Sequence, residues 1–305
     1  MENGGLMLAA FSSFFFSVTS LLAKKVGLPP LVLSWFGFLG LTVLSAPLFA
    51  IHRKWSPPPK AARLVLLRSV VGTLFVILSF CAVERIPIGD ASVLFYTAPV
   101  FTVGLAYVFL GEPCPPHGLP LIVALMAGVV LVTRPPALFG GGGGPSGDYV
   151  LGSAMALGAS LAEAVSNVAL RQLKSVHYSA VMFAHGVTSL ILTSALLVTM
   201  TTGSSANTWT LDASPVEFVV LPLVLAACSA LEQLTMTLAL SVEQAGPVSL
   251  VQASDMIFGY LYQVLFFGEP LSPISVVGAV IIGAVVLQMS KNKNNRPSNT
   301  KFYDC

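Results

Sequence analysis

The sequence predicts an all-α membrane protein with ten transmembrane helices, arranged as two inverted repeats of five helices each. Three observations lead to this fold class. The composition is strongly apolar, ten segments reach or nearly reach the length of a bilayer span, and one short block of sequence occurs twice at the ends of matched segments.

The composition places this chain among polytopic helical membrane proteins. Charged residues make up 9% of the chain and apolar residues 55%, whereas roughly 25% of residues are charged in soluble proteins. The net charge of +2 gives no reason to expect a nucleic-acid partner. Four scattered cysteines fit neither a disulfide framework nor a metal site. We therefore expect the lipid bilayer as the surroundings and neither a metal nor a cofactor.

The apolar segments are separated by breaks rich in proline and glycine. A span needs about 20 mostly apolar residues, and the fifth and tenth segments are the shortest. The ten predicted spans are Gly5–Ala23, Pro30–Ile51, Leu64–Val83, Ala91–Leu110, Gly118–Thr133, Tyr149–Leu170, Tyr178–Thr201, Val216–Leu240, Pro247–Phe267 and Ile274–Met289.

A flexible linker divides the spans into two modules. Residues 134–148 begin with Arg-Pro-Pro and contain five consecutive glycines, a composition typical of a tether. We therefore expect a first repeat over residues 5–133, a second over residues 149–290, and a tail over residues 291–305.

The two modules share sequence at their ends. Residues 109–113 read Phe-Leu-Gly-Glu-Pro and residues 266–270 read Phe-Phe-Gly-Glu-Pro. The stretch 89–113 aligns with 246–270 without a gap, and seven of the 25 positions are identical. We interpret Gly-Glu-Pro as architectural, because glycine and proline end helices. The glutamate is expected to bind backbone amides of the next helix.

The repeat also covers the start of each module, since Gly5–Val26 aligns with Gly152–Leu173. Five spans per module is an odd number, so the two modules must have opposite orientations in the membrane, as in many secondary transporters. Doubled membrane modules are mostly transporters.

The basic residues predict the orientation. With ten spans, one side collects ten of them and the other side four, and the positive-inside rule places both termini in the cytoplasm. The ten are Arg53, Lys54, Lys60, Arg63, Arg171, Lys174, Lys291, Lys293, Arg296 and Lys301, and the four are Lys24, Lys25, Arg85 and Arg134.

Ionisable residues inside the spans are the candidate functional groups, because a charge at mid-bilayer costs about 2.5–3.5 kcal/mol on insertion scales. Counted along their helices, all five lie at a similar depth, which predicts a shared internal cavity. They are Arg68, Glu163, His185, Glu232 and Asp255.

Further polar residues share a helix face with these groups. Gln252, Asp255 and Tyr262 follow helical spacing in the ninth span. Ala98 is the counterpart of Asp255 in the first repeat, so the repeats differ where function is expected. Structural roles are open for the others: Arg68 could extend to the headgroups, and the carboxylates and His185 could bond between helices.

The chain resembles the EamA-type drug/metabolite transporters, and more closely the G branch of solute carrier family 35. The residues that carry the resemblance cover the chain from Gly5 to Met289. They are the two Gly-Glu-Pro blocks, Leu67-Arg68, Asp90-Ala91, Pro99-Val100-Phe101-Thr102, Arg134-Pro135-Pro136, Ala245-Gly246-Pro247-Val248, Asp255 and Gln263.

The resemblance implies ten helices, alternating access, and a substrate cavity between the inverted halves. It implies roles for Arg68 and Asp255 in binding, whereas Glu163 and Glu232 match no family motif. The chain departs from the family in the second span, where an arginine is common but Pro30–Ile51 contains none.

These observations predict a secondary transporter, not an enzyme, for a small polar metabolite, most simply an organic anion. Arg68 would attract the anion, Tyr96 and Tyr262 would line the site, and a carboxylate such as Asp255 would couple transport to protons. The rivals are a nucleotide-sugar transporter or exchanger and a regulatory membrane protein without transport. The plasma membrane, the endoplasmic reticulum and the Golgi all remain open, as does a homodimer.

Overall fold

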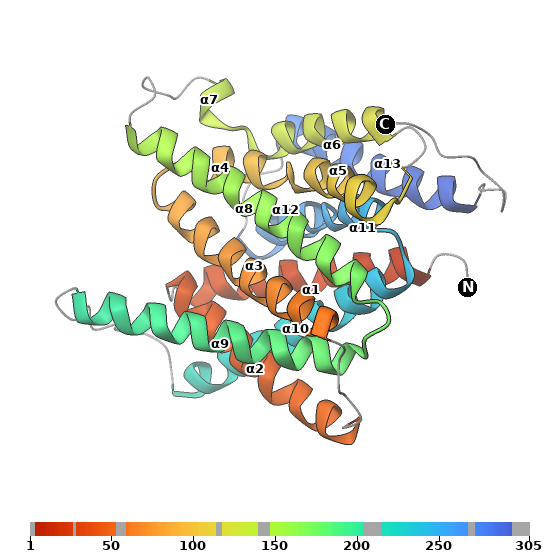
Figure 1. Ribbon diagram of the computed structural model, residues 1–305. Helices are drawn as coiled ribbons and strands as arrows, with labels where there is room; N and C mark the ends of the chain where they lie inside the picture. Colours follow the sequence, from red (N-terminus) through yellow and green to blue (C-terminus); the bar gives the residue numbers. More distant parts are fainter. Residues whose placement is uncertain are drawn as a thin grey trace.

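The computed structural model describes residues 4–26, 29–52, 59–113, 118–139, 147–203, 215–267 and 272–294. Within these ranges every regular element is an α-helix, which agrees with the all-α prediction (Figure 1). The helices are α1 (Gly4–Val26), α2 (Pro30–Ile51), α3 (Pro59–Val83), α4 (Ile88–Phe95), α5 (Ala98–Leu110), α6 (Gly118–Thr133), α7 (Pro136–Phe139), α8 (Gly147–Gln172), α9 (Tyr178–Gly203), α10 (Pro215–Val242), α11 (Ala245–Gln252), α12 (Asp255–Phe267) and α13 (Pro273–Asn294).

Eight segments of the described chain are long and apolar enough to cross a membrane. One of them, Ile88–Leu110, combines α4 and α5. The apolar helix α6 has 16 residues, fewer than a typical span. The second Gly-Glu-Pro block, the five-glycine run and the end of the tail lie outside the described residues.

The fourth and ninth spans differ from the prediction, because each is interrupted where one continuous helix was expected. The first break falls at Tyr96 and Thr97, between α4 and α5, and the second at Ala253 and Ser254, between α11 and α12. In the alignment of 89–113 with 246–270 these are the same two positions. The two aligned segments therefore share a helix break as well as sequence.

Local chemistry explains the breaks. Pro99 lacks a backbone N–H and lies in the first turn of α5. Ser254 and Asp255 are residue types favoured at a helix N-terminus, where α12 begins. Side chains satisfy the freed carbonyls, as buried membrane helices require. Ser13 of α1 donates to the carbonyl of Gln252 at 3.0 Å.

Helix packing follows the same twofold correspondence. The alignment pairs α1 with α8, the order along the chain pairs α3 with α10 as the third predicted span of each half, and α3 packs along α8 just as α10 packs along α1. The helices α2 and α9 pack on one another, and so do α6 and α13. Backbones approach closely in the latter pair, since a Cβ atom added to Gly278 would lie 2.6 Å from the carbonyl oxygen of Gly128. Such contacts between small residues are typical of membrane helices.

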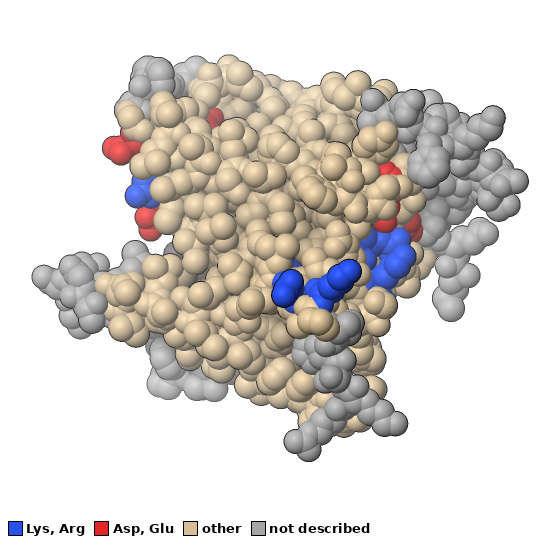
Figure 2. All heavy atoms as spheres, in the orientation of Figure 1, with Lys and Arg blue, Asp and Glu red and all other residues tan. Residues whose placement is uncertain are grey.

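The surface has charges at the ends of the bundle. Figure 2 shows basic side chains where α3 begins and α8 ends, with acidic ones beside them on the right, charges of both signs where α3 ends and α8 begins, and an uncharged surface between the two ends. On the right of Figure 1, α1 begins and α13 ends at the same end of the bundle as the start of α3. We call this the basic end. An uncharged belt between charged ends is what a bilayer requires.

Candidate functional site

The five ionisable residues lie at a similar depth. Counted from the basic end of its helix, or of the α11–α12 segment for Asp255, each is seven to ten residues inside, or roughly 10–15 Å. Arg68 lies deeper than the predicted span Leu64–Val83 implies, because α3 begins at Pro59 and not at Leu64. We call these five residues, with Tyr96, Gln233, Gln252 and Asn167, the polar centre.

Arg68 points into the bundle and not toward the headgroups. Arg68 as a whole is only 5% exposed. Its Nη1 atom lies 3.1 Å from Nε2 and 3.2 Å from Nδ1 of His185, and its Nη2 atom donates to Oε1 of Gln233 at 2.8 Å. The guanidinium is thus held by α9 and α10, and the alternative of a side chain that snorkels to the surface is wrong.

His185 is a packed residue between helices. It is 3% exposed. Its Nδ1 atom lies 3.2 Å from Oγ of Ser189, which in turn accepts a hydrogen bond of 2.7 Å from Thr73 on α3. His185 therefore orients the Arg68 guanidinium from α9. Gln233 was not among the residues predicted from the sequence, although it directly follows Glu232 in α10.

Gly72 provides the space for the guanidinium, one turn after Arg68 on α3. A Cβ atom at Gly72 would lie 2.7 Å from Nη1 of Arg68 and 3.2 Å from Cε1 of His185. The first distance is too short for a real contact, so Nη1, at the end of the flexible Arg68 side chain, would have to shift relative to its partners His185 and Gln233.

We predict that Gly72→Ala displaces the Arg68 guanidinium and lowers transport at least fivefold while the protein still folds. Uptake into proteoliposomes and the melting temperature measure the two effects. Gly104→Ala is the matched control, because no atom lies within 4 Å of a Cβ built at Gly104 on α5. Equal uptake by the two variants would contradict the prediction.

Tyr96 and Asp255 join the two helix breaks. The hydroxyl of Tyr96 donates to Oδ1 of Asp255 at 2.8 Å, across 159 residues of chain. Ser17 of α1 donates to the backbone carbonyl of Asp255 at 2.8 Å. Asp255 is the first residue of α12, where the helix macrodipole favours an anion. The two interrupted spans are therefore linked through a partly buried hydrogen bond.

We predict that Tyr96→Phe lowers the transport rate about tenfold, because the variant frees the Asp255 carboxylate and uncouples the two breaks. A hydrogen bond to a charged group contributes about 1.5–3 kcal/mol, and the lower end of this range corresponds to about a tenfold change in rate. Tyr107→Phe, at a tyrosine on the exposed surface of α5, should retain the rate of the parent protein. A rate for Tyr96→Phe within a factor of two of that control would rule out the role.

The two glutamates of the polar centre differ in their contacts. Glu232 accepts a hydrogen bond of 3.4 Å from Gln233 and interacts electrostatically with Arg68, Glu163 and Asp255. Glu163 keeps some accessible surface, and within the described part of the chain its carboxylate has no hydrogen bond or ion pair. It lies close enough to Asp255 to interact with it electrostatically.

Three predicted site residues remain, namely Gln252, Tyr262 and Gln263, and they do not share one location. Gln252 accepts a hydrogen bond of 3.2 Å from Asn167 of α8, which places it in the polar centre. Because the helix is interrupted after Gln252, it does not share a continuous helical face with Asp255 and Tyr262, as was expected. The Tyr262 ring instead packs edge-on against Phe14 of α1, with centroids 6.4 Å apart. The side chain of Gln263 lies outside the described residues.

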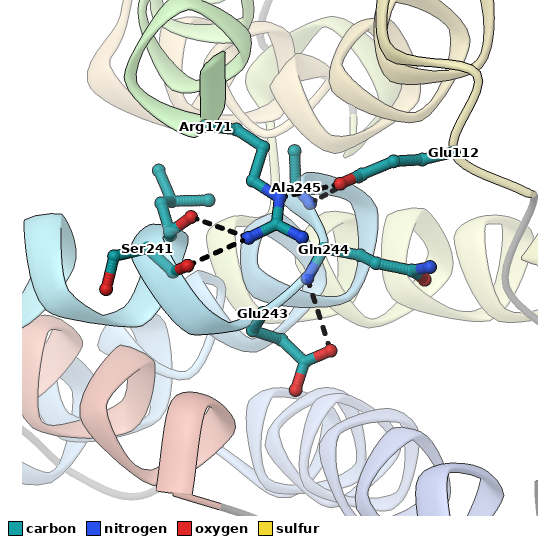
Figure 3. A network of polar contacts seen from close by, with 7 residues as sticks. Glu112, Arg171, Ser241, Glu243, Gln244 and Ala245 are labelled. Carbon is teal, nitrogen blue, oxygen red and sulfur yellow. Dashed lines mark hydrogen bonds and ion pairs between the residues drawn. The ribbon is translucent and has the colours of Figure 1, made fainter. Parts of the chain in front are cut away.

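The first Gly-Glu-Pro block anchors a second polar network, at the basic end (Figure 3). The Glu112 carboxylate accepts hydrogen bonds from Nε of Arg171 at 2.7 Å and from the backbone N–H of Ala245 at 2.8 Å. Nη1 of Arg171 donates to the carbonyls of Leu240 and Ser241, at 3.0 and 3.2 Å. One ion pair therefore caps both the end of α10 and the start of α11.

This network corrects the expectation that Glu112 binds the next helix, which is α6. Its partner is the N-terminus of α11, in the second half of the chain, where the macrodipole stabilises an anion. Gly111 makes the turn possible, because its φ of +62° is a left-handed conformation that glycine adopts without strain. Glu269, the counterpart of Glu112, lies outside the described residues.

A pocket of about 360 Å³ lies near this network and away from the polar centre. Its walls come from the end of α8, the α8–α9 connection and α10, and include Lys174, His177 and Ser241. The His177 ring stacks on that of His52, with centroids 4.2 Å apart. Partial burial lowers the pKa of His177, and the neighbouring His52 lowers it further.

Comparisons with known proteins agree with this architecture. Residues 3–134 match the model of the EamA-like transporter family. The chain is 29% identical to human solute carrier family 35 member G1 over 287 residues, 92% of this chain and 77% of that protein. It is 26% identical to the pseudopaline exporter CntI of Pseudomonas aeruginosa over 300 residues, 95% of this chain and 97% of that one.

A solved crystal structure has the same fold. It superposes with a TM-score of 0.76 at 16% sequence identity, covering 94% of this chain and 98% of that chain. The apolar helices and the relatives together define a multi-pass membrane transporter of small molecules, and not an enzyme. Residues 3–134 therefore resemble EamA-like transporters, and most of the chain is similar to the G branch of solute carrier family 35.

Proposed function

We propose that the protein is a secondary transporter that moves a small polar metabolite with an anionic group by alternating access. The observation that carries this proposal is the buried Arg68 guanidinium, held at mid-bundle between α9 and α10. A cation this deep in a membrane protein is costly, and such residues usually mark a functional site. A guanidinium binds carboxylates through two hydrogen bonds. One relative is by name an exporter, of pseudopaline, which supports a transport function.

The proposed mechanism uses two inverted five-helix halves, residues 5–133 and 149–290, joined by the linker 134–148. The matched packing of α3 with α8 and of α1 with α10 supports this arrangement. So do the breaks at equivalent positions, since interrupted helices at mid-membrane form binding sites in many transporters. We infer ten spans, with the α11–α12 segment and α6 among them.

The proposed orientation places the basic end, with both termini, in the cytoplasm. The Glu112–Arg171 ion pair at this end connects the first half to the second. Opening a path to the polar centre from the cytoplasm would require the halves to separate there. We infer that this pair forms part of the cytoplasmic gate, and that the carboxylates of the polar centre are candidates for proton coupling.

Counterflow with the purified protein in proteoliposomes tests the proposal. Vesicles are loaded with an unlabelled mixture of small carboxylates, and uptake of each labelled compound is measured with and without a pH gradient. We expect uptake above that of protein-free vesicles and no competition by UDP-sugars. Competition by UDP-sugars would indicate the nucleotide-sugar alternative. If no carboxylate enters under any gradient, the protein is not this kind of transporter.

A further inference from the structure

The pocket at the basic end has a lining suited to an anion. The described residues that line it include Lys174, His177 and four side chains with hydroxyl groups, and none of them is acidic. Within the described part of the chain, the Lys174 ammonium makes no ion pair, and the Ser175 hydroxyl makes no hydrogen bond. The pocket therefore offers a positive charge and hydrogen-bond donors that its own residues leave unused.

His177 adds a donor whose position is fixed. The backbone N–H of Ser179 donates to Nδ1 of His177 at 3.4 Å, and the hydroxyl of Ser179 lies 2.8 Å from the same atom. Nδ1 is therefore the unprotonated nitrogen, and the proton of the neutral ring is on Nε2. The rings of His52 and Tyr178 pack on the imidazole, with centroids 4.2 and 4.4 Å away. The Nε2–H group is thus held in place as a donor.

The free donors share one wall of the pocket. Lys174, Ser175 and His177 all belong to the short connection between α8 and α9. On the opposite wall, the hydroxyls of Thr237 and Ser241 already donate to carbonyls of their own helix, α10. A ligand with several acceptor atoms would therefore bind to the connection first.

The rest of the pocket is apolar and lies where the spans end. Its lining includes Leu170 and Leu173, which are both buried, and Leu238. The candidate spans on either side end at residue 172 and begin at residue 178. This is the level of the lipid headgroups, with the hydrocarbon core of the bilayer next to it. Donors beside an apolar surface at this level match a charged headgroup with an acyl chain.

We propose that this pocket binds a phosphate monoester group, which accepts hydrogen bonds from Lys174, Ser175 and Nε2 of His177. Lysine commonly binds phosphate, and a phosphate has more acceptor oxygens than a carboxylate. The apolar lining favours the headgroup of an anionic lipid over free phosphate as the source, and basic pockets between membrane helices bind such headgroups. This inference does not depend on the proposed substrate or transport mechanism.

A bound phosphate group would also strengthen the basic end. Ser241 lines the pocket from α10, and its backbone carbonyl accepts a hydrogen bond from Arg171 of α8 (Figure 3). A ligand between the α8–α9 connection and α10 would bridge the same two helices beside the Glu112–Arg171 ion pair. Because such a ligand binds only the folded protein, it should raise the melting temperature.

Binding of a fluorescent dioctanoyl phosphatidic acid to the purified protein in detergent, measured by fluorescence polarisation, tests the proposal. Unlabelled dioctanoyl phosphatidic acid should displace the probe at a concentration at least tenfold lower than dioctanoyl phosphatidylcholine, which is a phosphate diester with a positive choline. Equal displacement by the two lipids would show that only the acyl chains bind, and would overturn the proposal.

Glycerol 3-phosphate, which has the phosphate monoester without acyl chains, distinguishes the two sources. Displacement by phosphatidic acid at a concentration at least tenfold below that of glycerol 3-phosphate would support the site and assign it to a lipid. Displacement by both at similar concentrations would support the site and assign it to a soluble phosphate compound.

Lys174→Gln is the variant that tests the residues. It removes the charge of an exposed side chain, so the variant should fold and melt like the parent protein without ligand. We expect it to bind phosphatidic acid at least tenfold more weakly and to lose the rise in melting temperature. Lys60→Gln, at an exposed lysine near the start of α3 at the same end, is the matched control and should bind like the parent. Equal binding by the two variants would show that the lipid binds elsewhere.

Discussion

Replacing Arg68 by alanine is expected to lower substrate uptake about 100-fold or more. A hydrogen bond to a charged group contributes about 1.5–3 kcal/mol, and a guanidinium makes two such bonds to a carboxylate. The loss of about 3 kcal/mol or more corresponds to this change in affinity. The measurement is the initial rate of uptake into proteoliposomes at substrate concentrations below saturation.

Arg68→Lys separates the geometry of the guanidinium from its charge. A lysine ammonium retains the positive charge but lacks the planar fork that reaches His185 and Gln233 together. We expect uptake to remain at least tenfold below the parent protein. Arg85→Ala is the control at the end of α3, where the arginine side chain is 33% exposed, and it should transport normally. Normal uptake by Arg68→Ala would remove this residue from the site.

Replacing Glu112 by glutamine is expected to have the largest effect on stability. The side chains of Arg171 and Glu112 are only 14% and 12% exposed. Removing one partner of a buried pair costs about 3–5 kcal/mol, and the remaining exposure and the retained carbonyl partners of Arg171 reduce this to about 2–3 kcal/mol. The apparent melting temperature in detergent should fall by roughly 5–10 °C.

The Glu84–Arg85 pair is the matched control for Glu112. Its atoms are 3.9 Å apart and its side chains are 67% and 33% exposed, so Glu84→Gln should change stability by less than about 1 kcal/mol. Equal melting temperatures for Glu112→Gln and Glu84→Gln would show that the network at the basic end does not stabilise the fold.

Exchanging the two charges of the network should not restore stability. In the double variant Glu112→Arg with Arg171→Glu, the new carboxylate would face the carbonyls of Leu240 and Ser241, and the new guanidinium would face the N–H of Ala245. Both helix ends would then carry the wrong charge. A melting temperature restored to that of the parent would show that only the pairing matters.

Much of the fold could be predicted because the bilayer restricts what a sequence can do. A segment without charges must become a helix that satisfies its own backbone, and so the bounds of α6 agree with the predicted span at both ends. The helix breaks were missed for the same reason. The segments around Thr97 and Ser254 stay apolar on both sides, and hydropathy does not respond to an interruption of two residues.

The residue types of the polar centre could also be predicted, but their partners could not. Charge inside a span is visible in a sequence, which singled out Arg68 and Asp255. Gln233 and Tyr96 became partners of these residues only through contacts across 165 and 159 positions of the chain. Such pairings depend on how the helices rotate and cross, which no local pattern encodes.

The Gly-Glu-Pro block illustrates the division between sequence and tertiary structure. From composition, repetition and backbone preference, which are local properties, the sequence predicts a membrane protein of two similar modules in which a glycine followed by a glutamate ends a helix. The binding of Glu112 to Arg171 and to the start of α11 depends on how the helices pack and cannot be read from the sequence. An anion at the end of its own helix is unfavourable, and it becomes favourable only when packing brings the N-terminus of another helix to it.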